Sequence, residues 1–102
     1  MANFIEVLDS DNLQPGRCTT VTLEGRNIAL YNVDGEIYAT DDACMHAGSS
    51  LGWGILEGKF IRCRAHGMRY DVTTGKVMGE ADAGVKSYET EVRDGKIRVA
   101  VD

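Results

Sequence analysis

Two cysteines and two histidines form the pattern in this sequence with the clearest chemical meaning. Cys44 and His46 are separated by one residue, Cys63 and His66 by two, and sixteen residues lie between the two pairs. The chain contains no other histidine. Thiolates and imidazoles together bind zinc or the irons of an iron–sulfur cluster. The alternative is two buried cysteines beside two surface histidines, but that pairing would have to arise twice by chance.

The distribution of cysteine and histidine between the two pairs helps to distinguish a zinc site from an iron–sulfur cluster. Zinc fingers usually offer their cysteines as one pair and their histidines as another. Here each segment supplies one of each, which suits a two-iron cluster with one iron held by both cysteines and the other by both histidines. Glycines around each pair would let two loops close over such a cluster, with backbone N–H groups directed at its sulfides. A zinc-stabilised binding module remains the alternative.

The rest of the chain reads as short strands joined by tight turns. Pairs of a polar residue and glycine at 24–25, 34–35 and 94–95 are typical of type I′ hairpin turns. No segment has a sustained apolar period of 3.6 residues, so long helices are not expected. We predict strands at residues 4–8, 18–23, 27–33, 37–40, 59–62, 88–93 and 97–101, with one short helical turn within 9–16. The fold class is therefore all-β, a sandwich or barrel of antiparallel strands.

Both Cys/His pairs lie in segments that interrupt this pattern. Residues 41–55 and 63–67 are rich in glycine, serine and small side chains, as loops are. Loops held on a rigid scaffold commonly carry the chemistry of a β domain. We expect one domain over residues 1–102, with these two segments as its functional loops.

Composition excludes several classes of function. The chain has 102 residues, a net charge of −5 and 43% hydrophobic residues, which is enough for a core but unsuited to nucleic acid. No apolar run approaches the roughly 20 residues needed to cross a bilayer, and the N-terminus has no signal-peptide pattern. Three cysteines are too few for a disulfide framework. These features predict a cytoplasmic protein with no membrane contact.

The spacing of these cysteines and histidines resembles that of the Rieske family. The pattern of that family is C-x-H, a spacer of fifteen to seventeen residues, then C-x-x-H-G, and this chain reads CMH, sixteen residues, CRAHG. The likeness covers nearly the whole chain and continues through Gly48, Leu51, Gly54, the pair 70–71 and Gly75. It implies a Rieske-like antiparallel β-sandwich whose two cluster-binding loops form a small subdomain. One [2Fe–2S] cluster would be held by the four residues Cys44, His46, Cys63 and His66.

The ferredoxins that serve ring-hydroxylating dioxygenases are the members that this chain resembles most. The resemblance implies a monomeric one-electron carrier in aromatic hydrocarbon catabolism. It would pass electrons from a flavoprotein NAD(P)H-dependent ferredoxin reductase to a terminal Rieske non-haem iron oxygenase. An oxygenase would need a further iron with two histidines and a carboxylate, and both histidines are already used, so the chain is expected to be no enzyme. The alternative is a Rieske-like small subunit of a larger reductase, such as nitrite reductase.

Departures from the family pattern refine these expectations. Ser49 and Ala65 stand where respiratory members have a disulfide between the loops. Met68 replaces a serine whose hydroxyl contacts a cluster sulfur, whereas Tyr70 keeps the corresponding tyrosine. Gly48 and Gly67 are expected to lie beside the cluster, together with Met68 and Tyr70. Losing one hydrogen bond to sulfur places the expected midpoint potential near the lower end of the Rieske range, about −150 mV.

The surroundings of the loops indicate where a partner would dock. Met45, Leu51 and Trp53 are predicted to form an apolar rim, although Leu51 and Trp53 are equally compatible with packing of the loops. Residues 59–76 carry a net charge of +4 within an acidic chain. Lys59 and Arg64, with their neighbours Arg62 and Arg69, are candidates for steering a partner, the alternative being an ordinary solvated surface. Cys18 is expected to be a buried packing residue.

Overall fold

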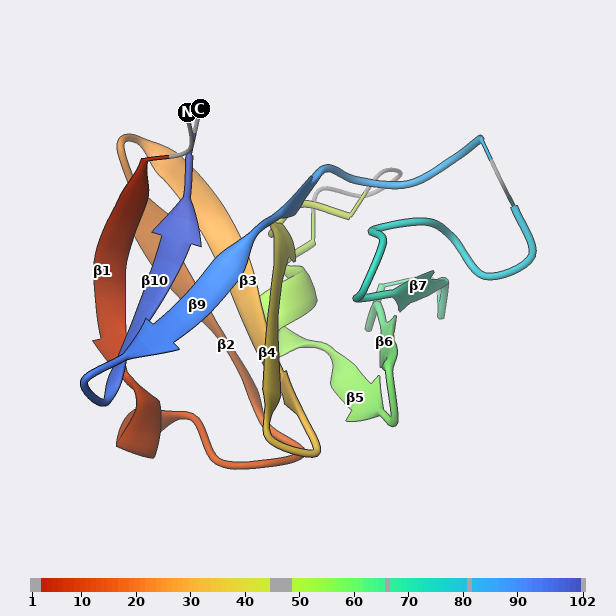
Figure 1. The fold of residues 1–102 in the computed structure, drawn as a ribbon. Helices are drawn as coiled ribbons and strands as arrows, with labels where there is room; N and C mark the ends of the chain where they lie inside the picture. Colours follow the sequence, from red (N-terminus) through yellow and green to blue (C-terminus); the bar gives the residue numbers. More distant parts are fainter. Residues whose placement is uncertain (1–2, 45–48, 66, 81, 102) are drawn as a thin grey trace.

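The computed structural model describes residues 3–44, 49–65, 67–80 and 82–101, and in this part of the chain nearly all regular structure is β (Figure 1). Two short 3-10 helices, η1 and η2, lie between strands. In chain order the elements are β1 (Phe4–Asp9), η1 (Ser10–Asn12), β2 (Cys18–Leu23), β3 (Arg26–Val33), β4 (Glu36–Asp41), η2 (Leu51–Trp53), β5 (Ile55–Glu57), β6 (Phe60–Arg62), β7 (Arg69–Asp71), β8 (Ser87–Tyr88), β9 (Thr90–Arg93) and β10 (Lys96–Ala100). The predicted all-β class is confirmed.

Two antiparallel sheets form the base of the molecule. One has the order β1-β10-β9 and the other β2-β3-β4-β8. The three predicted hairpin turns are present, and in each both central residues have positive φ, for example 52° at Asp34 and 94° at Gly35. Two positive φ values give a type I′ turn, whose twist matches that of the paired strands.

Strand β3 joins the two cores of the protein because both of its faces are buried. Ile28 and Leu30 point into a first core between the two base sheets, together with residues of β10. Ala29 and Tyr31 point to the opposite face, into a second core. Because side chains alternate along β3, one face of this strand packs in the core of the base and its other face packs in the core of the candidate site.

A third sheet, β5-β6-β7, lies apart from the base sheets and carries the other side of the second core (Figure 1). The first predicted loop runs from β4 to β5 and includes η2. The second predicted loop connects β6 to β7. The sequence did not predict β5 or β7 as strands, since each has only three residues and no visible alternation.

The strand predicted at 88–93 is interrupted at Glu89, which is a correction with a simple cause. Tyr88 in β8 pairs with Ala39 of β4, whereas Thr90 in β9 pairs with Val99 of β10. The chain thus leaves one base sheet and joins the other within two residues. Within the described ranges, no helix has the length and apolar character to span a membrane.

Candidate functional site

The two candidate cysteine ligands are buried in the second core. Cys44 follows β4 and is 2% exposed, and Cys63 directly follows β6 and is fully buried. Both belong to one cluster of buried side chains. Neither forms a disulfide. Two loops from different sheets therefore bring two thiols into one water-excluded region, which favours a soft metal centre over surface chemistry.

Each cysteine begins a short loop whose ends are joined by a backbone hydrogen bond. The Cys44 N–H donates to the Ser49 carbonyl at 2.8 Å, and the Cys63 N–H donates to the Met68 carbonyl at 2.8 Å. In the second loop the Gly67 N–H also donates to the Cys63 carbonyl at 2.9 Å. Gly67 has φ of +72°, a conformation that suits glycine. These bonds fix the position of each cysteine relative to the strands that carry it.

The other predicted ligands, His46 and His66, lie outside the described residues, as do Met45 and Gly48. Among the residues that are described, no group of three or more His, Cys, Asp or Glu side chains is arranged as a metal site. The assignment of the four ligands therefore stays a prediction.

Tyr70 packs in the same core as the two cysteines and connects the strand after the second loop to Cys44 in the first loop. It lies on β7, after the second loop, and is fully buried. Its hydroxyl lies 3.3 Å from the Cys44 Sγ in the first loop. A hydroxyl at this distance can donate to a thiolate and stabilise its charge. Met68, which is partly buried against the second core, has no hydroxyl to add a second such bond.

Residues 50–54, which we call the strap, hold the first loop against the base. Built onto Gly52, a Cβ atom would lie 2.1 Å from the Thr20 Oγ1 and 2.7 Å from the Thr19 carbonyl of β2, so only glycine fits. The Cys18 thiol donates to the carbonyls of Gly52 at 3.4 Å and of Gly54 at 3.8 Å. Cys18 is therefore half-buried beside the site, although the sequence places it far away.

The apolar rim is only partly as predicted. Leu51 is fully buried and packs in the second core, so its assignment to the rim is wrong. Trp53, two residues later, is 74% exposed. The 3-10 turn of η2 explains this difference, since it directs these two side chains to different sides.

The environment of Cys18 gives a testable pH dependence. Burial raises the pKa of its thiol, the charge of Arg64 opposes this effect, and Asp42 adds to it. Less thiolate is then present at neutral pH than for an unperturbed cysteine, and the thiolate is the nucleophile. We expect iodoacetamide to alkylate Cys18 slowly, with a pH midpoint above that of free cysteine. Mass spectrometry across pH measures this, with Cys18→Ser as the control for the other thiols. A midpoint at or below that of free cysteine would contradict the assignment.

Ion pairs neutralise much of the predicted basic patch. Lys59 Nζ lies 3.2 Å from the Asp71 carboxylate. Arg62 and Arg69 both contact Glu57, at 3.5 and 3.6 Å. Arg64 is exposed, and its Nε donates to the Trp53 carbonyl at 2.5 Å. Arg64 thus connects the second loop to the strap.

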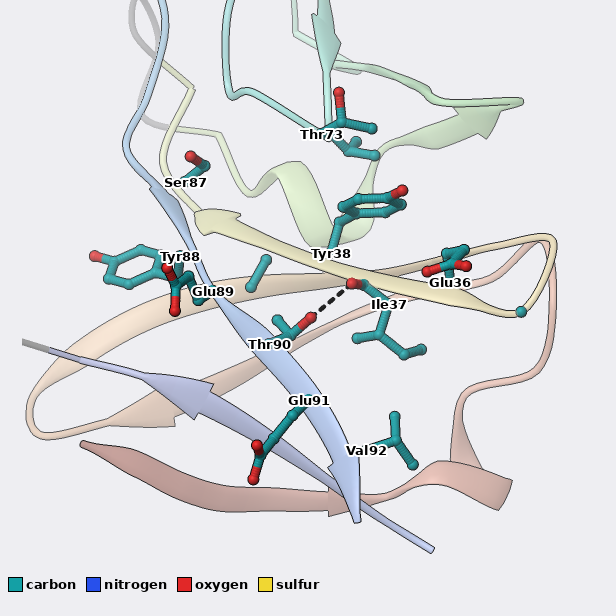
Figure 2. A pocket seen from close by; sticks show the side chains of 13 residues that line it. Glu36, Ile37, Tyr38, Thr73, Ser87, Tyr88, Glu89, Thr90, Glu91 and Val92 are labelled. Carbon is teal, nitrogen blue, oxygen red and sulfur yellow. Dashed lines mark hydrogen bonds between the residues drawn. The ribbon is translucent and has the colours of Figure 1, made fainter. Parts of the chain in front are cut away.

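A separate cavity of about 680 Å³ lies between β4 and β9, and none of the described residues that line it is a cysteine or histidine. Figure 2 shows the Thr90 side chain, which lines the cavity, directed at the backbone of Ile37. The Thr90 hydroxyl donates to the Ile37 carbonyl at 2.6 Å. This bond ties β9 to β4 where the two sheets separate, so the cavity belongs to the scaffold and not to the cysteine site.

Comparison with known proteins agrees with this geometry. Residues 3–89 match the model of the Rieske [2Fe-2S] domain. The chain is 38% identical to the ferredoxin component of the naphthalene 1,2-dioxygenase system of Pseudomonas putida, over 97% of this chain and 94% of that protein. A solved complex of reduced oxygenase and oxidized ferredoxin in carbazole 1,9a-dioxygenase contains a chain that is 33% identical. Its TM-score is 0.86, with 95% of this chain and 92% of that chain covered.

A third similarity bears on the alternative function. A Mycobacterium tuberculosis protein assigned as an NADH-dependent nitrite reductase small subunit superposes with a TM-score of 0.90, covering 100% of this chain and 97% of that one. Its sequence identity is 23%, which shows a shared fold and no more.

The chain belongs to the Rieske [2Fe–2S] family. Within that family it is a ferredoxin component of the aromatic dioxygenase type, an electron carrier rather than an enzyme. Its cofactor is an iron–sulfur cluster. The donor chemistry of the described residues fits this group, since two buried thiols share one core and one of them has a hydroxyl beside its sulfur.

Asp42 and Cys18 are the residues near the site that sequence reasoning missed. The sequence offers a weak signal for Asp42, an acid two residues before the first candidate ligand. It offers none for Cys18, because only the pairing of β2 with the strap brings Cys18 close.

Proposed function

We propose that this chain carries one electron at a time on a single [2Fe–2S] cluster held by Cys44, His46, Cys63 and His66. The observation that carries the proposal is the burial of Cys44 and Cys63 in one core, each at the start of a closed loop. Near-full-length similarity to ferredoxin components supports it. We propose further that residues 1–102 act as one domain, a monomer in the cytoplasm.

The proposed ligand set determines how readily an electron is accepted. With two thiolates and two neutral imidazoles, the bound cluster supplies a centre that goes from zero to −1 on reduction, whereas four thiolates give −2 to −3. Tyr70 stabilises the added negative charge through the Cys44 sulfur, and Met68 adds no second hydroxyl. Burial of both cysteines excludes water from their side of the site. A midpoint near the lower end of the Rieske range, about −150 mV, follows.

A potential in this range suits transfer between a flavoprotein reductase and a terminal oxygenase. We infer that both are partners of this chain, in a system that oxidises an aromatic substrate. The solved ferredoxin–oxygenase complex of carbazole dioxygenase supports this inference. The corresponding surface here is proposed to include the exposed Trp53 and the neighbouring Arg64, with Lys59 contributing less because Asp71 neutralises it.

Exchange of electrons with these partners tests the function, and Arg64 is the sharpest probe. Arg64→Glu reverses a charge that no described carboxylate neutralises, so we expect association to slow about fivefold at low salt. The difference should shrink as ionic strength rises, because the Debye length falls. Stopped-flow reduction by the reductase and oxidation by the oxygenase measure both steps.

Arg64→Lys is the matched control, since it keeps the positive charge and removes the Nε bond to Trp53. Wild-type rates in Arg64→Lys together with slow rates in Arg64→Glu assign the effect to charge. Equal rates in all three proteins with both partners would remove Arg64 from the docking surface. Absence of electron exchange with both the reductase and the oxygenase would overturn the proposed function. It would favour the alternative, a small subunit of a larger reductase, and co-purification with that reductase would reveal it.

A further inference from the structure

Asp42 is a buried acid that the proposed electron-transfer function does not use. It is 6% exposed and lies between the end of β4 and Cys44. Three donors converge on its Oδ1 atom: the Thr20 hydroxyl at 2.9 Å, the Ser50 hydroxyl at 2.9 Å and the Gly52 N–H at 2.8 Å. Three hydrogen bonds to one oxygen fix the orientation of the Asp42 side chain.

These bonds connect three separate parts of the chain. Thr20 lies on β2 of the base, and Ser50 and Gly52 belong to the strap. The Asp42 backbone carbonyl also accepts from the Leu51 N–H at 2.6 Å. Asp42 therefore connects the strap to β2 of the base. The Cys18 thiol adds hydrogen bonds to the strap carbonyls of Gly52 and Gly54.

The position of Asp42 relative to Cys44 gives it a second effect. Asp42 stands two residues before Cys44, the first proposed cysteine ligand, so their Cα atoms are at most about 7 Å apart. In a buried region a charge at such a distance is weakly screened. Adding an electron nearby is opposed by a fixed negative charge.

We propose that Asp42 is a positioning residue of the cluster site, which holds the first loop through the strap and lowers the reduction potential by its charge. This inference rests on the proposed function, because it requires the cluster. Asp42 and its three donors should therefore have two separable effects, one on the retention of the cluster and one on its reduction potential.

Two variants separate the effects in the holoprotein. Asp42→Asn keeps one acceptor oxygen and removes the charge, so the equilibrium constant for reduction should rise about tenfold, which is 59 mV for a one-electron couple. Ser50→Ala removes one strap hydrogen bond and leaves the charge. Its midpoint should stay near that of wild type, while the cluster absorbance should decay several-fold faster under mild denaturant.

Asp34→Asn is the matched control, because it makes the same chemical change in an exposed hairpin turn. Its midpoint and rate of cluster loss should equal those of wild type. A midpoint for Asp42→Asn equal to that of Asp34→Asn would overturn the electrostatic role, and unchanged cluster loss in both Asp42→Asn and Ser50→Ala would overturn the positioning role. If wild type itself holds no iron–sulfur cluster, the proposed function fails instead, so the two failures are distinguishable.

Discussion

Replacing Cys44 by serine is expected to abolish the cluster. A serine hydroxyl is a much poorer ligand for iron than a thiolate, so the site would lose one of its two proposed thiolate ligands. We expect more than a 100-fold loss of cluster affinity, since even partners of metal ligands contribute about 10- to 100-fold. Loss of visible absorbance and of bound iron in the purified variant measures it.

Cys18→Ser is the control, since it makes the same substitution at the third cysteine. This variant should keep its iron, because Cys18 is outside the proposed ligand set and its thiol donates to carbonyls of the strap. Full cluster retention in Cys44→Ser would remove this residue from the ligand set. Equal loss in both variants would assign the effect to folding rather than to ligation.

Gly52→Ala is expected to cause a large loss of stability. The added methyl group would lie 2.1 Å from the Thr20 Oγ1 and within 3 Å of two backbone atoms of Thr19. Backbone cannot rotate away, so the strap must lift from β2 and break the Gly52 bond to Asp42. We expect a cost of about 3 kcal/mol in the free energy of unfolding, which lowers Tm by more than about 10 °C.

Gly16→Ala separates this steric effect from the conformational freedom of glycine. Gly16 has φ of +84° and no atom within 4 Å of an added Cβ. Its cost is limited to backbone strain of about 1 kcal/mol. Thermal unfolding followed by circular dichroism compares the two variants. Equal Tm values for both would show that the strap is not packed as closely as the geometry requires.

The scaffold was predictable because its signals are local. A polar residue followed by glycine encodes each type I′ turn, and alternation encodes the longer strands, so β2, β3, β4 and the final hairpin were expected near their observed bounds. The three-residue strands of the third sheet were not expected. They are defined by pairing with each other, as between Ile61 and Tyr70, and such pairing has no signature within either segment.

The environment of the candidate site was not predictable from the sequence. Spacing selected Cys44 and Cys63 as candidate ligands, and the structure buries both in one core, whereas the full ligand set stays a prediction. The contacts around them depend on distant segments. Cys18 and Asp42 meet at the strap only because β2 pairs with β3 and lies under η2, and neither residue has a sequence motif. The exposure of Trp53 beside the buried Leu51 likewise depends on the turn of η2.

Metal analysis of the purified protein decides between an iron–sulfur cluster and zinc at the proposed site. Iron, acid-labile sulfide and zinc should be quantified in the same purified sample, with electron paramagnetic resonance of the dithionite-reduced protein. We expect two irons and two sulfides per chain, and a spectrum of one unpaired electron with mixed histidine and cysteine ligation. One zinc per chain without iron or sulfide, in a colourless protein, would contradict it.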